Sequence, residues 1–259
     1  MFRKFRILVL LLILATVALA AWRADRRLGA WEHSIHVGVY PVAGDDSPAT
    51  REFVRALETD AFAEIAEWLQ EQSKRHGRTV LQPVVLRVAP PLGEQPPLPP
   101  PHASTLDIIR WSLELRWWAG RHDAIAGPKP DIRLFVLFHD PEKTPLLPHS
   151  TGLEKGRIGL IYAFASRQQS RQNAVVIAHE LLHTFGASDK YDPATLQPLW
   201  PAGYAEPDSE PRLPQRYAEI MGGRIPLAAG RAEIPDSLVD TVIGNATAGE
   251  IGLRPAAAR

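Results

Sequence analysis

The sequence contains no cysteine among its 259 residues, which excludes disulfide bonds and zinc sites built from thiolates. It also carries no net charge, because 29 Lys and Arg balance 29 Asp and Glu. Without a basic excess or a basic patch, we expect no nucleic-acid partner. The composition is otherwise that of a globular protein, 45% hydrophobic and 22% charged, in a chain long enough for one large domain or two small ones.

The first 27 residues have the pattern of a targeting segment. Three basic residues precede an uncharged run over residues 7–22, and three arginines follow it. The run is 16 residues long, fewer than the ~20 that comfortably span a bilayer, and Ala-Leu-Ala at 18–20 matches a signal-peptide cleavage site. A cleaved signal peptide and a retained N-terminal membrane anchor are both open. Either one predicts export to the periplasmic or extracellular side and leaves residues 28–259 as the folded domain.

Strand and helix signals alternate along the first two thirds of the chain. Strands are predicted over residues 33–42, 79–89, 131–139 and 157–165. A Ser-Pro pair begins a long predicted helix over 47–77, and a Ser-x-x-Asp capping box begins another over 104–120. The apolar stripe of this second helix is assigned to the core: Ile108, Trp111, Leu115 and Trp118.

The order of these elements indicates an α/β (α+β) chain, with a mixed sheet and helices packed behind it. After residue 190 the pattern becomes irregular and rich in proline. A short helix is predicted over 235–243, and the last ten residues are expected to fray.

The strongest chemical signal is the stretch His179-Glu180-Leu181-Leu182-His183. In a helix, residues four apart share a face, so the two imidazoles would project side by side and hold one Zn²⁺ at ~2.0–2.1 Å. Glu180 would reach a water on that ion and take its proton. Gly186 lets the chain leave the helix in a left-handed turn, which would bring Asp189 back as a third ligand. Three protein ligands leave a position open, as in catalytic zinc sites.

These residues form the pattern HExxHxxGxxD, which resembles the zinc signature of the metzincin-like metalloproteases in the variant ending in Asp, as in the snapalysins. The resemblance implies a zincin-like fold, one catalytic Zn²⁺ bound by His179, His183 and Asp189, and Glu180 as the general base. Metzincins also have a methionine turn beneath the zinc. Met221, within the stretch Glu-Ile-Met-Gly-Gly, fits that role, although a methionine filling a gap in the core fits equally well.

The resemblance also implies an edge strand above the site that pairs with an extended peptide, and we assign it to the segment 147–165. The third ligand has alternatives in the sequence, namely Asp192, Glu206, Glu210 and Glu219. Candidates to stabilise the oxyanion of the reaction are Tyr191, Tyr204 and Tyr217, each of which could instead be a packing residue.

The sequence therefore predicts an exported zinc metalloendopeptidase acting on a peptide or protein substrate. Two alternatives stay open. One is a zincin scaffold that binds an envelope partner without turnover, and the other is a hydrolase of a non-peptide cell-wall amide. The intact Glu180 favours catalysis over the scaffold, since a purely structural zinc site has no use for that carboxylate. The oligomeric state has no signature in the sequence.

Overall fold

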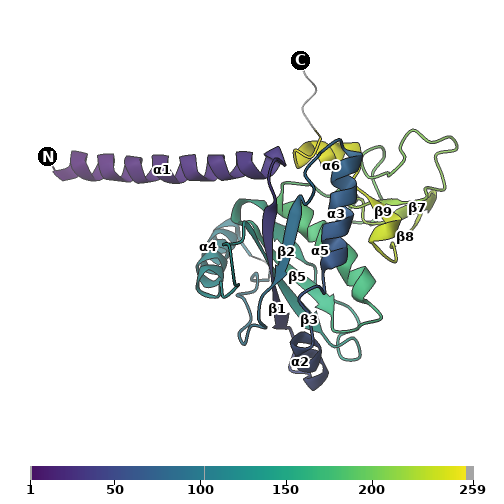
Figure 1. The fold of residues 1–259 in the computed structure, drawn as a ribbon, viewed down its shortest axis with the longest axis horizontal. Helices are drawn as coiled ribbons and strands as arrows, with labels where there is room; N and C mark the ends of the chain where they lie inside the picture. The colour runs from purple at the N-terminus through teal and green to yellow at the C-terminus, as the bar shows by residue number, and fades with distance from the viewer. Residues whose placement is uncertain (1, 102, 255–259) are drawn as a thin grey trace, which may run out of the picture.

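The computed structural model describes residues 2–101 and 103–254, and it is a mixed α/β structure built on a five-stranded sheet (Figure 1). The strand order is β2-β1-β3-β5-β4. Four strands are parallel: β1 (Ile35–Ala43), β2 (Val84–Val88), β3 (Ile132–His139) and β5 (Ile158–Phe164). The short β4 (Thr151–Leu153) runs antiparallel to β5 and forms one edge. The mixed sheet and its four longer strands are thus as the sequence predicted.

The central strand β3 shows why the predicted strands are so apolar. Leu134 and Val136 face one layer of helices, and Phe135 and Leu137 face the other, all at most 1% exposed. A parallel sheet covered on both sides needs apolar residues at successive positions instead of an alternating pattern. The sheet therefore separates two apolar cores.

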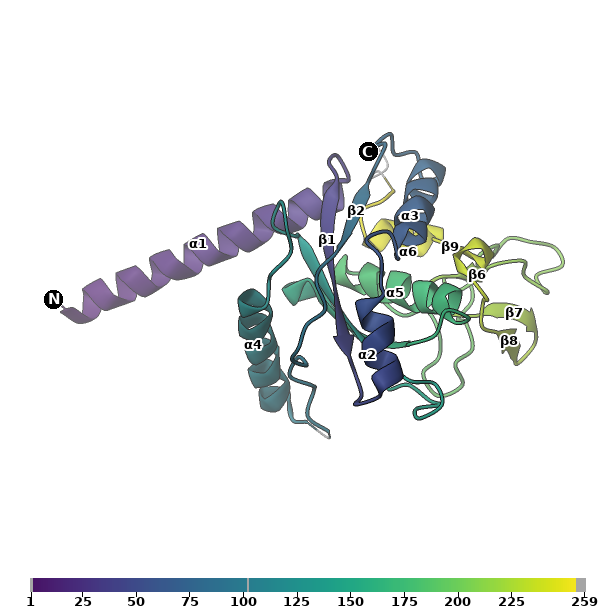
Figure 2. The same cartoon turned by 60° about the horizontal axis from the view of Figure 1, so that its bottom comes forward.

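One core packs against α3 (Ala63–Arg75) and α5 (Ser170–Thr184), and the other packs against α4 (Thr105–Arg121), as Figure 2 also shows. The capping box of α4 is present, with reciprocal bonds between Ser104 and Asp107. Its predicted core stripe is confirmed for Trp111, Leu115 and Trp118 and is wrong for Ile108, which is 41% exposed.

The helix predicted over 47–77 is wrong as a single element. The structure has α2 (Pro48–Arg55) and α3, separated by turns over residues 56–62. Two stripes of matching period on successive helices look like one stripe when only spacing is considered. The N-terminal segment forms α1 (Phe2–Ala30), which extends away from the domain (Figure 1). Within the described part of the chain, we find no helix with both the length and the apolar character required to cross a membrane.

The C-terminal third consists of short elements, drawn green to yellow in Figure 1. In chain order they are β6 (Ala218–Glu219), β7 (Ile225–Ala228), β8 (Arg231–Glu233), a 3-10 turn (Leu238–Asp240), β9 (Thr241–Val242) and α6 (Asn245–Glu250). The helix predicted over 235–243 is therefore wrong. Another 3-10 turn, Glu154–Gly156, lies earlier in the chain, between β4 and β5.

The expected fraying of the last ten residues is also wrong for those that the structure describes. Ile251 and Leu253 are each 1% exposed, and the Ile251 carbonyl accepts a hydrogen bond from the Trp31 indole. The remaining residues of that prediction, 255–259, lie outside the described residues.

Candidate metal centre

The two histidines of the HExxH stretch lie on α5 near its C-terminal end. Their spacing of four residues places the rings on one face, and the two Nε2 atoms are 3.1 Å apart. The side of α5 that packs against the sheet is apolar, with Ile177, Ala178 and Leu181 fully buried. The imidazoles are thus carried on a rigid element.

The hydrogen bonds of the Nδ1 atoms define how each ring is oriented. His179 Nδ1 lies 2.9 Å from the carbonyl of Ile220, and His183 Nδ1 lies 2.8 Å from the carbonyl of Ala187. A carbonyl only accepts, so both Nδ1 atoms carry a hydrogen and both neutral rings direct a lone pair from Nε2. Metal-ligating histidines have this arrangement, with the second nitrogen held by a backbone carbonyl.

Asp189 brings a carboxylate to the same point. Gly186 has φ of +99°, so the predicted left-handed turn after the helix is confirmed. The turn returns the chain, and Asp189 Oδ1 lies 3.2 Å from both Nε2 atoms. Burial alone would raise the pKa of Asp189, but its contacts with the two histidines hold that pKa well below its usual range. The three side chains therefore meet, and their role as metal ligands stays a prediction.

The separations fit a tetrahedral metal ion. Zinc bonded at ~2.0–2.1 Å to its ligand atoms would separate them by ~3.3 Å, close to the 3.1 and 3.2 Å between these nitrogens and the oxygen. Two lone pairs and a carboxylate oxygen repel one another unless a cation or proton lies among them. The donor set of two imidazoles and one carboxylate therefore suits Zn²⁺.

Two carboxylates compete for the third position. Glu180 and the two histidines offer ligand atoms within 4.8 Å of one another, so Glu180 could also join a metal site. We favour Asp189 because its Oδ1 is equally close to both nitrogens, and because its side chain is 42% exposed and so accessible to a metal ion from solvent. Glu180 is then left free for chemistry beside the metal.

Glu180 has the environment of a buried base. It is 6% exposed, and its Oε2 makes no hydrogen bond with any residue that the structure describes. Burial raises the pKa of Glu180, while the two histidines and the Gly152 N–H favour its charged form. A Cβ on Gly152 would lie 2.5 Å from the Glu180 carbonyl and from His183 Cβ, so only glycine lets β4 approach α5 this closely.

The segment around Met221 lies against the first histidine. Ile220 supplies the carbonyl that holds His179, and the completely buried Met221 accepts a hydrogen bond from the Lys190 N–H at 2.9 Å. The predicted methionine turn is therefore close to the histidines, and its assignment as such stays a prediction.

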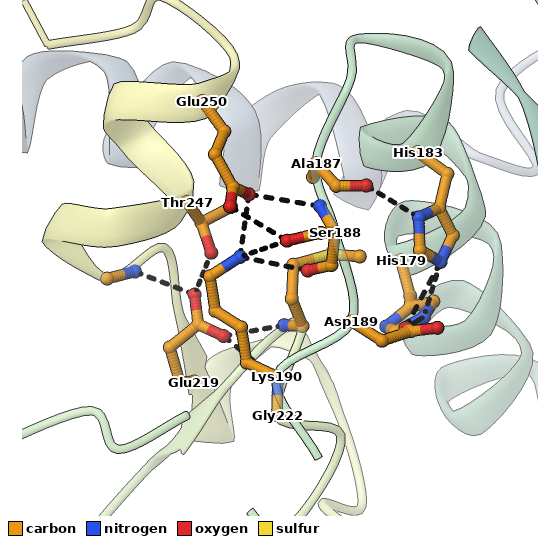
Figure 3. A network of polar contacts seen from close by, with 12 residues as sticks. His179, His183, Ala187, Ser188, Asp189, Lys190, Glu219, Gly222, Thr247 and Glu250 are labelled. Atoms are coloured by element: carbon orange, nitrogen blue, oxygen red, sulfur yellow. Dashed lines mark hydrogen bonds and ion pairs between the residues drawn. The ribbon is translucent and has the colours of Figure 1, made fainter. Parts of the chain in front are cut away.

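Glu219 stabilises this turn and is fully buried (Figure 3). Its Oε2 accepts hydrogen bonds from the N–H groups of Met221 and Gly222 at 2.8 and 2.9 Å. Its Oε1 accepts from the Gly244 N–H at 3.0 Å and from the Thr247 hydroxyl at 2.6 Å. Because its four acceptor positions are taken, Glu219 is a poor candidate for the third ligand.

Lys190 and Glu250 hold the loop that carries Asp189. Lys190 is 4% exposed, and its Nζ lies 2.6 Å from Glu250 Oε2 and 2.8 Å from the Ser188 carbonyl. Glu250 also accepts from the Ser188 N–H and hydroxyl at 3.0 and 2.8 Å (Figure 3). The residues on both sides of Asp189 are thus bonded to α6. The sequence analysis missed Lys190, Glu250 and Gly152, because nothing local indicates their distant partners.

The remaining candidates have other contacts. Asp192 accepts from the N–H groups of Ala194 and Thr195 at 2.7 and 3.1 Å and so stabilises a turn. Burial, together with the negative charges of Asp189 and Glu180, raises the pKa of the Tyr191 hydroxyl. Glu206 and Glu210 belong to the loop over 206–215, which is closed by bonds between Glu206 and Gln215. Tyr204 pairs with Ala218 through its backbone, and the Tyr217 ring lies 5.6 Å from the Arg216 guanidinium.

Comparison of the chain with protein-family models finds no match, and comparison with curated protein sequences finds none either.

Proposed function

We propose that this protein is a zinc-dependent metalloendopeptidase with a zincin-like fold. The observation that carries the proposal is the convergence of His179 Nε2, His183 Nε2 and Asp189 Oδ1 at 3.1–3.2 Å, beside the buried, unshared carboxylate oxygen of Glu180. A structural zinc site is closed by four protein ligands, whereas three ligands beside a buried base suit hydrolysis.

Each residue of the site would have a separate role in the reaction. His179, His183 and Asp189 would hold Zn²⁺, which when bound lowers the pKa of a water molecule and polarises a carbonyl group. Glu180 takes a proton from the attacking water and delivers it to the leaving amine nitrogen. Of the three tyrosines, Tyr191 is the best candidate to donate a hydrogen bond to the developing oxyanion, because Asp189 and Glu180 are close enough to its hydroxyl to raise its pKa.

The edge strand β4 supports the proposal that the substrate is an extended peptide. It is the last strand of the sheet and lies against α5 at Gly152. A peptide added along its free edge would pass the Glu180 carboxylate, which is the β-augmentation mode of recognition. We further propose export directed by the N-terminal segment, as its charge pattern predicts.

Metal content tests the site. Purified wild-type protein should contain about one zinc per chain, as three convergent ligands imply. Asp189→Ala should bind zinc much more weakly, measured by competition with a chelator. Asp192→Ala is the matched control and should retain it. Equal zinc in the Asp189 and wild-type proteins would contradict the assigned third ligand.

Glu180→Gln tests the chemistry. The variant should keep its zinc and lose roughly 10²–10⁴-fold in peptide hydrolysis, the usual contribution of a positioned general base. Glu67→Gln, an exposed glutamate on α3, should cleave at the wild-type rate. Cleavage of a peptide library and of cell-wall fragments, assayed side by side, separates a peptidase from a hydrolase of another amide. Wild-type rates in Glu180→Gln would exclude the mechanism.

A further inference from the structure

Helix α4 is apolar on two opposite sides. Its inner side packs on the sheet through Trp111, Leu115 and Trp118. Its outer side carries a second stripe at spacings of three and four residues, which places the members on one face. The stripe consists of Leu106, Ile109, Leu113 and Trp117, which are 77%, 51%, 58% and 65% exposed.

Such a stripe is uncommon on a helix of a soluble domain, where the outer face normally carries polar residues. Single exposed apolar residues need no explanation, but a contiguous apolar face indicates a binding surface. Four successive turns of α4 each present one large apolar side chain to the outside. The outer face of α4 is therefore a candidate interaction surface.

Arginines border the stripe on both sides. At 100° per residue, Arg116 falls on one flank and Arg110 and Arg121 fall on the other, where Asp107 and Glu114 are the acidic neighbours within the helix. All three arginines are exposed, and the Arg121 guanidinium lies 4.8 Å from the centre of the Trp117 ring. An apolar strip with Trp and Leu between arginines has the composition of helices that lie in a membrane interface.

We propose that α4 binds the surface of a bilayer containing anionic lipids, with its outer stripe among the headgroups and its arginines paired with phosphates. Arg flanks match negative headgroups, and Trp prefers the interface between water and hydrocarbon. A second copy of the chain is a poorer occupant. A 17-residue helix face covers only about 250 Å², against the roughly 800 Å² per partner of a stable dimer, and arginines would face arginines.

The position of α1 agrees with this docking. Both views show α1 leaving the domain on the side that carries α4 (Figures 1 and 2). Several of its apolar residues are 57–65% exposed, namely Phe5, Leu10, Leu11, Leu12 and Leu14. Because α4 and α5 cover opposite faces of the sheet, docking through α4 leaves the metal centre on the layer that faces away from the bilayer.

A site-specific probe can test this in the full chain, since the absence of cysteine allows a single label. Leu113→Cys would carry an environment-sensitive fluorophore, and Val239→Cys, which is 77% exposed on the 3-10 turn 238–240, is the matched control. Both proteins would be mixed with vesicles of phosphatidylcholine alone or with phosphatidylglycerol. We expect a blue shift, and quenching by nitroxide-labelled lipids, only for the probe at 113 and only with phosphatidylglycerol.

The control distinguishes membrane binding through α4 from binding through α1. Binding through α1 alone would bring both labelled proteins to the vesicles without moving either probe into lipid. Replacing Arg110 and Arg121 by Gln in the Leu113→Cys protein should lower the ratio of docked to undocked α4 by about 25-fold, since each basic residue contributes roughly fivefold at an anionic surface. An unchanged probe at 113 on vesicle-bound protein would overturn the proposal. A blue shift at 113 that needs no vesicles and grows with protein concentration would overturn it in favour of self-association.

Discussion

The two parts of the molecule that meet at the candidate metal centre are stabilised in different ways. The sheet and α5 are held by apolar burial, with side chains such as Leu134, Ile161 and Leu181 fully buried. The segment from Gly186 to Leu253 has little regular structure, and buried polar groups join its loops, chiefly Lys190 and Glu219. The first part supplies the two histidines, and the second supplies Asp189.

This difference indicates how the site is assembled. The histidines come already placed on a packed helix, whereas Asp189 depends on bonds that connect distant loops with α6. Apolar burial is non-directional, while hydrogen bonds to a buried carboxylate specify one geometry and are costly when incomplete. The polar network thus gives the irregular part the precision that a metal ligand requires.

The largest loss of stability is expected from a substitution in the apolar core between the sheet and α5. Leu134→Ala removes a side chain that is 0% exposed on the central strand, and we expect a loss of about 3–5 kcal/mol in the free energy of unfolding. Urea unfolding followed by circular dichroism measures it. Leu81→Ala, at a position 82% exposed, is the control and should change stability little. A loss below ~1 kcal/mol at Leu134 would mean that this core tolerates voids.

A smaller and more local loss of stability is expected from a substitution in the polar network of the segment 186–253. Glu219→Gln replaces an oxygen that accepts hydrogen bonds by an amide that donates, so some of its four donors lose their partner. We expect a loss of roughly 2–3 kcal/mol and faster hydrogen exchange at Met221 and Gly222.

Zinc affinity should fall with it, because the neighbouring Ile220 carbonyl holds His179. Glu233→Gln, on the exposed β8, is the matched control. Unchanged zinc affinity in Glu219→Gln, measured by chelator competition, would show that the turn keeps its geometry without the carboxylate.

The smallest loss of stability is expected from removing a partly buried ion pair and hydrogen bond beside the sheet. Asp123 is bonded to the Tyr40 hydroxyl and the Arg133 guanidinium. Burial alone would raise the pKa of Asp123, but these two partners lower it. The stability that it contributes is therefore present above the unfolded-state pKa of ~3.9 and is lost as the pH falls through the lower folded-state value.

Asp123→Asn should remove about 1 kcal/mol at pH 7 and less near pH 3. Thermal unfolding of both proteins at several pH values tests the sign. A difference that grows toward low pH would contradict the assigned lowering of the Asp123 pKa.

The sequence was sufficient to predict an element where its local pattern of apolar residues agrees with its burial in the fold. The four longer strands and the HExxH helix follow from the apolar pattern, and α4 follows from its capping box and apolar stripe. It was insufficient where an element depends on distant partners. The break between α2 and α3 and the short β4 lack a local signal, and the predicted helix over 235–243 is a 3-10 turn followed by β9.

The same limit applies to the site. His179, His183 and Asp189 are close in sequence, and a helix followed by a glycine turn suffices to bring them together. Lys190, Glu219 and Glu250 could not be predicted, since they meet only after the chain has folded around α6. Their roles depend on which buried donors face which carboxylates, and composition and spacing do not contain that information.

The hydrogen bond from the Lys190 N–H to the Met221 carbonyl joins the two ends of the segment 191–220. A loop whose ends are fixed together can change in length at low cost, about 0.6 kcal/mol for each doubling. Variation in the middle of this segment, over 192–217, would therefore leave the histidines and Asp189 undisturbed while reshaping the surface beside them. Under the proposed function, the reactive groups and the specificity would thus lie on separately mutable parts of the chain, and new specificities could be selected by exchanging one loop.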